Sequence, residues 1–154
     1  MQIQSIEIEA IVEAAIPPFL SRAQQHGVIL KINPIPDIMV KVDCFQIELV
    51  LRNLLDNAFD AVLSQPNGNR AIVLSSGIVD GETLEITITD SGPGVSGDMV
   101  GKLFEPFVSS KSSGMGLGLV LSRTIIEAHG GNLWAEIGDH GVFKFALPLE
   151  EAKK

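Results

Sequence analysis

The sequence predicts an α+β protein, a two-layer α/β sandwich in which a mixed, mostly antiparallel sheet of about five strands is covered on one face by about three helices. Segments of period-two apolar alternation are interspersed with segments of helical periodicity. The pair Asp80-Gly81 between two strand-like segments predicts a hairpin, and hence antiparallel pairing. The length of 154 residues suits one domain spanning 1–154, and 45% hydrophobic residues suffice for its core.

The first elements are short. Residues 2–8 alternate as an edge strand, and a helical stretch follows to about Gln25. Because proline cannot continue a helix, Pro17-Pro18 must kink this stretch or begin its second half. Gly27 ends the stretch, and two strands separated by a proline-rich turn are expected at 28–32 and 38–42.

The longest helix is expected from an N-cap at Asp43 to about Leu63. Its apolar residues recur at three- and four-residue spacing and so share one core-facing stripe. They are Ile47, Val50, Leu51, Leu54, Ala58, Ala61 and Val62. The hairpin strands are expected at 71–79 and 83–89.

Residues 91–113 have almost no periodicity and many Gly, Ser and Pro residues, which is typical of a functional lid or binding loop. A helix is expected from about Gly116 to His129, ended by Gly130-Gly131. We expect its inner face to contain Leu117, Val120, Leu121, Thr124 and Ala128. Strands at 133–137 and 142–147 complete the domain.

Composition excludes several functions. The net charge of −8 argues against a nucleic-acid partner, because phosphate backbones are bound by clustered Lys and Arg. Cys44 is the only cysteine, so no internal disulfide can form. No signal peptide and no apolar run of roughly 18 residues is visible, which favours the cytoplasm and no direct membrane contact.

Asp90 is the first candidate functional residue. Period-two counting places it on the same face as Leu84, Ile86 and Ile88, where a carboxylate is costly unless a donor meets it. Gly92 follows and allows close approach to the backbone, as Gly94 does. The carboxylate either caps a turn that ends the strand or accepts a hydrogen bond from the exocyclic amine of adenine.

Asn53 and Asn57 lie four residues apart and so share one face of the long helix, with Asp56 and Asp60 nearby. They form either a solvated polar stripe or a magnesium site. In the second reading Asn57 offers a neutral oxygen to Mg²⁺ and Asn53 orients water or phosphate.

The third candidate is the glycine cluster Gly114-Met115-Gly116-Leu117-Gly118. It is either a flexible loop or a phosphate site built from backbone N–H groups at a helix start. It lacks the GxxxxGK[ST] pattern of a Walker A loop. Lys111 either adds positive charge there or is simply exposed. Phe104 and Phe107 either pack in the core or dock the loop when nucleotide binds.

The order of these motifs resembles histidine kinases. Asn53–Ala58 resembles their N box, Asp90–Gly94 their G1 box, Leu103–Phe107 their F box and Gly114–Leu119 their G2 box. The likeness covers nearly the whole chain and is strongest with oxygen-sensor and nitrogen-regulator kinases. It implies the Bergerat ATP-binding fold shared with DNA gyrase, in which a loop closes over the nucleotide.

The resemblance also implies residue roles. Asp90 would recognise adenine, Asn57 would ligate Mg²⁺, and the G2 glycines with Lys111 would meet the phosphates of ATP. Asn53 and Lys111 are the expected catalytic residues. The expected nucleotide site comprises Asn53, Asn57, Asp60, Asp90, Gly92, Gly94, Phe104, Phe107, Lys111, Gly114, Met115, Gly116, Leu117 and Gly118.

Two departures from the family pattern stand out. A Thr that relatives often carry near adenine is matched here by Val142, and no histidine lies in a phospho-acceptor context. The expected reaction is therefore transfer from Mg-ATP to a histidine on a separate helical dimerisation domain, with a response regulator downstream. The alternatives are a stand-alone serine kinase or ATPase of anti-sigma type and a non-catalytic nucleotide-binding module. We expect this domain alone to be monomeric.

Overall fold

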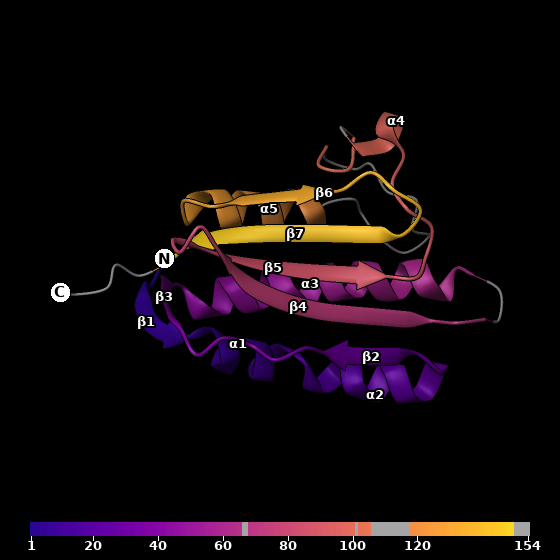
Figure 1. Cartoon of the computed structure of the whole chain (residues 1–154), viewed down its shortest axis with the longest axis horizontal. Helices are drawn as coiled ribbons and strands as arrows, with labels where there is room; N and C mark the ends of the chain where they lie inside the picture. Colours follow the sequence, from indigo (N-terminus) through magenta and orange to yellow (C-terminus); the bar gives the residue numbers. More distant parts are fainter. Residues whose placement is uncertain (66–67, 101, 106–117, 150–154) are drawn as a thin grey trace.

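The computed structural model describes residues 1–65, 68–100, 102–105 and 118–149. Its main sheet has five strands in the order β2-β4-β5-β7-β6 (Figure 1). The β2–β4 pair is parallel and the other three pairs are antiparallel, as predicted. The strands are β2 (Ile29–Ile32), β4 (Ala71–Val79), β5 (Thr83–Asp90), β6 (Asn132–Ala135) and β7 (Gly141–Pro148).

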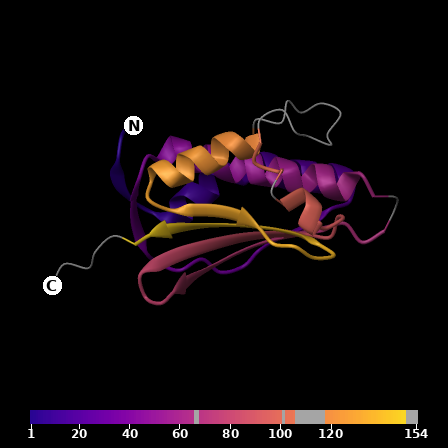
Figure 2. The ribbon, with the colours of Figure 1, turned by 90° about the horizontal axis from the view of Figure 1, so that it is seen from above.

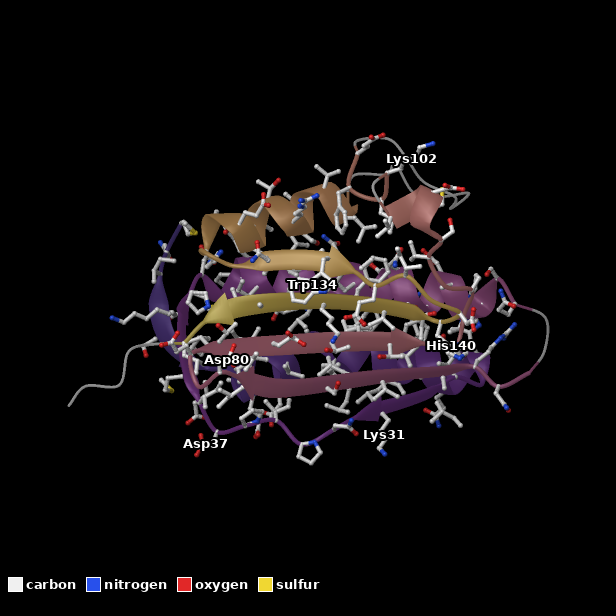
Figure 3. The ribbon with its side chains drawn as sticks, turned by 45° about the horizontal axis from the view of Figure 1, so that its top comes forward. Lys31, Asp37, Asp80, Lys102, Trp134 and His140 are labelled. Carbon is white, nitrogen blue, oxygen red and sulfur yellow. The ribbon has the colours of Figure 1, made fainter. Side chains whose placement is uncertain are left out.

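Helices line one face of this sheet. Figure 2 shows α3 (Cys44–Leu63) and α5 (Gly118–Ala128) lying side by side along it. The core between the layers contains the expected stripe of α3, except that Ala61 is only half-buried. The opposite face carries small and polar side chains around Trp134 (Figure 3), where the Lys144 Nζ lies 3.3 Å from both Glu85 and Glu136.

The N-terminal region differs from the prediction in its strand pairing, whereas its helices follow one of the two predicted alternatives, in which the prolines begin the second half of the helical stretch. β1 (Gln4–Glu7) pairs with β3 (Met39–Val42) as a separate two-stranded antiparallel sheet rather than as an edge of the main one. The helical stretch is two helices, α1 (Ile8–Ala15) and α2 (Pro17–His26). Both prolines stand in the first turn of α2, where a missing N–H costs nothing.

The turn residues behave as expected. Gly27 ends α2 at a φ of 65°, in the left-handed region that glycine tolerates. In the hairpin between β4 and β5, Asp80 and Gly81 both have positive φ, at 54° and 71°. These angles match the right-handed twist of the paired strands.

Helix α5 buries a different face from the one predicted. Its fully or nearly buried residues are Ser122, Ile125 and Ile126. Solvent-exposed instead are Leu121, Thr124 and Ala128. Apolar residues occur on nearly every side of this helix, so periodicity alone could not select the inner stripe. Leu117 lies outside the described residues.

Asp43 joins three parts of the chain. Its carboxylate accepts hydrogen bonds from the backbone N–H of Gln46 at 3.2 Å, as an N-cap of α3, and of Gln2 at 2.9 Å. Its own N–H donates to His129 Nε2 at 3.1 Å, while His129 Nδ1 donates to the Ile125 carbonyl at 2.7 Å. The start of α3, the end of α5 and the N-terminal segment therefore meet at one point.

Replacing Asp43 by Ala should lower the free energy of unfolding in a pH-dependent way. The N–H of Gln2, followed by those of Gln46 and Phe45, holds the pKa of Asp43 below its ordinary value of 3.8, against the opposing effect of burial. A lowered pKa contributes stability that is present above the ordinary value and is lost as pH falls below it. Denaturant unfolding from pH 7 to pH 2 measures this difference.

Asp43→Asn is the matched control, because Asn also caps helices but does not ionise in this range. The Asn variant should keep most of the stability and lose the pH dependence. A loss in Asp43→Ala that is the same at pH 2 and pH 7 would contradict the charged-cap assignment.

Candidate functional site

A cavity of ≈ 650 Å³ opens where α3, the end of the sheet and residues 93–95, 99 and 103 meet. This volume lies within the range of roughly 300–1,000 Å³ typical of small-molecule sites. The one-turn helix α4 (Gly97–Val100) contributes Met99 to its lining. The lining residues are Asn57, Asp60, Ala61, Leu63, Ser64, Asp90, Pro93, Gly94, Val95, Met99, Leu103, Gly141 and Phe143.

Asp90 forms a buried acidic spot on the cavity wall. It ends β5 on the same face as the buried Leu84, Ile86 and Ile88, as predicted, and is only 3% exposed. Its Oδ1 accepts a hydrogen bond from the Gly92 N–H at 2.8 Å. Burial raises the pKa of Asp90, although the N–H groups of Gly92 and Gly141 oppose the rise. The site therefore holds a buried carboxylate that two backbone N–H groups meet at the cavity wall.

Gly141 is a site residue that the sequence did not reveal. It pairs with Asp90 across β5 and β7, and a Cβ built on it would lie 2.2 Å from Asp90 Oδ2. The absence of a side chain makes room for the carboxylate. Val142, singled out from the sequence, pairs with Thr89, does not line the cavity and lies on the opposite face of the sheet. Knowledge of the β5–β7 register would have been needed to find Gly141.

Helix α3 brings two of the predicted residues to the cavity. Asn57 and Asp60 both line it, about one turn apart. Asn53 does not line it and is joined to α5 instead. Its Nδ2 donates to Ser122 Oγ at 3.1 Å and to the Gly118 carbonyl at 3.4 Å.

Gly92 and Gly94 each permit a close approach of two backbones. A Cβ on Gly92 would lie 2.8 Å from the Ala61 backbone of α3. One on Gly94 would lie 1.6 Å from the Gly138 carbonyl oxygen. Next to this contact, Val95 forms a parallel bridge with Ile137 and accepts a hydrogen bond from Gly138 at 3.2 Å. These glycines thus attach the segment after β5 to the sheet and to α3.

The remaining predicted residues divide into two groups. Phe104 is half-buried and packs against the core. The Arg123 Cζ atom lies over the Phe104 ring, 5.0 Å from the ring centroid. Gly118 is the first residue of α5. Outside the described residues lie Phe107, Lys111, Gly114, Met115, Gly116 and Leu117.

Comparison with known proteins identifies the class. The sequence profile of the family described as histidine kinase-, DNA gyrase B-, and HSP90-like ATPase matches residues 43–151. The chain belongs to this ATPase family. Within it, the chain corresponds to the catalytic domain of sensor histidine kinases, as the following relatives and solved structures establish.

Sensor kinases are among its relatives in sequence. It is 36% identical over 147 residues to the sensor protein FixL of Bradyrhizobium diazoefficiens. The aligned residues cover 94% of this chain and 29% of FixL. It is 33% identical over 149 residues to the C4-dicarboxylate transport sensor protein DctB of Rhizobium meliloti, covering 94% of this chain and 23% of DctB. The chain thus spans less than a third of the length of these relatives.

Solved structures agree with this assignment. The catalytic domain of histidine kinase ThkA superposes with a TM-score of 0.84 at 27% identity, covering 97% of each chain. Full-length ShkA in complex with AMPPNP superposes with a TM-score of 0.82 at 25% identity, covering all of this chain and 32% of that one. Within the described residues, no helix is both long enough and apolar enough to span a membrane.

Gly94→Ala should detach the segment after β5 from the sheet. The new methyl group would overlap the Gly138 carbonyl, so the two backbones must separate at a cost of about 1–3 kcal/mol or more. Gly97→Ala is the matched control, since a Cβ there meets only Ile137 Cδ1 at an ordinary 3.8 Å. Thermal unfolding should show a lower Tm for the first variant alone. Equal Tm values would refute the packing role of Gly94.

Asp90→Asn should gain stability relative to the wild-type protein as pH rises. A carboxyl whose pKa is raised on folding contributes stability below its ordinary value of 3.8 and loses it as pH rises through the folded pKa. The Asn side chain does not ionise, so the variant does not lose this stability as pH rises. Free energies of unfolding at pH 3 and pH 7 test the sign, and a wild-type protein that gains more than the variant over this interval would contradict it.

Proposed function

We propose that this chain binds Mg-ATP and donates its γ-phosphate to a histidine on a separate helical dimerisation domain of a two-component sensor kinase. The supporting observation is the placement of Asp90, a carboxylate 3% exposed on the wall of a ≈ 650 Å³ cavity and oriented by the Gly92 N–H. The exocyclic amine of adenine is a donor that suits this acceptor. Guanine has a carbonyl oxygen at that position and would be repelled.

The residues of the cavity suit magnesium. Among the residues that the structure describes, no cluster of three or more His, Cys, Asp or Glu side chains is placed to hold a metal. Asn57 instead offers a neutral oxygen at the cavity wall, with Asp60 beside it. Mg²⁺ commonly takes one or two protein oxygens and fills its shell with water and phosphate. When bound, it would neutralise charge on the phosphates.

The protein's part in the transfer is positioning and charge compensation. Asn53 carries a neutral amide, which cannot accept a proton as a general base, and this favours a histidine acceptor over a serine hydroxyl. Lys111 would add positive charge at the phosphates, together with the backbone N–H groups of the G2 glycines. The residues that would hold the nucleotide are the set predicted from the sequence, which does not include Asp56, and Gly141 joins them through its contact with Asp90.

The acceptor histidine would come from elsewhere in the kinase. His129 has both ring nitrogens engaged in hydrogen bonds, and His26 and His140 are exposed away from any helical acceptor motif. Histidine kinase ThkA has been solved in complex with the response regulator TrrA, which supports a response regulator as the next partner here. Because the relatives are sensor proteins, we place this domain in the cytoplasmic part of a sensor.

Calorimetric titration with ATP and GTP, with and without Mg²⁺, tests the binding proposal. We expect ATP to bind and GTP not to bind. Loss of a hydrogen bond to a charged group costs about 1.5–3 kcal/mol, so Asp90→Asn should weaken ATP binding by roughly 10- to 150-fold. Asn57→Ala should weaken binding chiefly when Mg²⁺ is present.

Asp56→Asn is the control for the α3 variants. Asp56 is exposed and pairs with Arg22 at 2.6 Å, outside the cavity, so ATP affinity should not change. Equal affinity for ATP and GTP would refute the adenine assignment. For the transfer step, radiolabel from ATP should reach a histidine on an added dimerisation domain. Labelling of serine alone would favour a serine kinase, and ATP binding without any transfer would favour a nucleotide-binding module.

A further inference from the structure

Ser122 is a buried hydroxyl on an otherwise apolar face. It is 0% exposed and shares the inner side of α5 with Ile125 and Ile126. A hydroxyl removed from water is costly unless it finds a partner. Its partner is the side-chain amide of Asn53 on α3, whose Nδ2 lies 3.1 Å from Ser122 Oγ. The N box is therefore in direct contact with the interior of α5.

This contact fixes which end of the Asn53 amide faces α5. The Gly118 carbonyl lies 3.4 Å from the same Nδ2, and a carbonyl oxygen can only accept a hydrogen bond. An amide nitrogen has two hydrogens, so these two acceptors use both of them. These two hydrogen bonds do not involve Oδ1, the oxygen of the same amide. Asn53 thus presents an acceptor, not a donor, on the side away from α5.

Asn53 and Asn57 lie on the same face of α3, because they are four residues apart. Asn57 lines the cavity and Asn53 stands one turn nearer the start of α3, beside the first turn of α5. An oxygen held at that place is suited to accept hydrogen bonds from the water shell of a magnesium ion bound near Asn57.

We propose that Ser122 is a positioning residue, which orients the Asn53 amide so that its oxygen faces the hydrated Mg²⁺ of bound Mg-ATP. The inference rests on the proposed function. Without the Ser122 hydroxyl, one amide hydrogen loses its acceptor and the amide can turn. The loss should then appear in the magnesium-dependent part of ATP binding, whereas a merely structural role would weaken all nucleotide binding equally.

The first experiment measures ATP affinity with Mg²⁺ and with EDTA by calorimetry. In Ser122→Ala, the gain in affinity that Mg²⁺ provides should shrink by about three- to tenfold, the worth of one hydrogen bond. Affinity in EDTA should stay within about twofold of the wild-type value. Ser122→Cys fills nearly the same space with a weak acceptor, so it should behave like Ser122→Ala without opening a cavity.

Thr124→Val is the matched control on the same helix. Thr124 is exposed and its hydroxyl donates to the Val120 carbonyl at 2.9 Å, so its removal does not reach Asn53. The magnesium gain of this variant should equal that of the wild-type protein. A reduced gain in Thr124→Val would mean that general disturbance of α5 is sufficient, and would overturn the proposal.

A second measurement needs no nucleotide. The Asn53 side-chain amide gives a pair of ¹H–¹⁵N signals, identified as the pair missing from Asn53→Ala. These signals should shift in Ser122→Ala and Ser122→Cys and stay in place in Thr124→Val. Unchanged signals in both Ser122 variants would show that Ser122 does not orient the amide.

The outcomes separate the inference from the proposed function. If the wild-type protein binds no ATP, the proposed function fails and the inference fails with it. If the wild-type protein binds Mg-ATP but Ser122→Ala lowers affinity equally with Mg²⁺ and with EDTA, or lowers neither, the proposed function stands and the positioning role of Ser122 is rejected.

Discussion

The structure depends on a carboxylate held inside the apolar layer at the end of β5. Burying Asp90 is unfavourable, and the fold limits this cost by aiming the Gly92 N–H at it and by leaving Gly141 without a side chain. The strand register, the turn after β5 and the start of β7 are all arranged around this one group. A core designed for stability alone would place an apolar residue there, which is why the site stands out physically.

Glycines around the cavity serve the protein's own packing as much as any ligand. Gly92 rests on α3 and Gly94 rests on the turn before β7, so the segment after β5 is attached at two points to the rigid layers. The sequence indicated that something approaches these backbones closely. It could not indicate that the approaching group belongs to the same chain, because the contacts join residues more than thirty positions apart.

The sequence predicted most of the fold, and the failures have specific causes. The stripe of α3 was identified because only one side of that helix is consistently apolar, and the hairpin because Asp80-Gly81 has strong turn chemistry. The prediction of which face of α5 is buried was wrong, because isoleucine and leucine occur on several sides of the helix. Serine residues are mostly exposed, so nothing in the sequence indicated that Ser122 lies in the interior. Gly141 was missed because only the pairing of β5 with β7 places it opposite Asp90, and the sequence does not give that register.

Helix α5 is fastened to α3 at both extremities. Near its start, the Asn53 side chain of α3 donates hydrogen bonds to Gly118 and Ser122. Just past its last residue, His129 accepts a hydrogen bond from the backbone of Asp43 at the start of α3. The two helices therefore run in opposite directions between these contacts. Because α5 is hydrogen-bonded to α3 at both ends, it cannot slide along its own axis without breaking the contacts at both ends together. The eleven residues of α5 are therefore held at a fixed axial position relative to α3, and the first of them, Gly118, is itself one of the bonded residues.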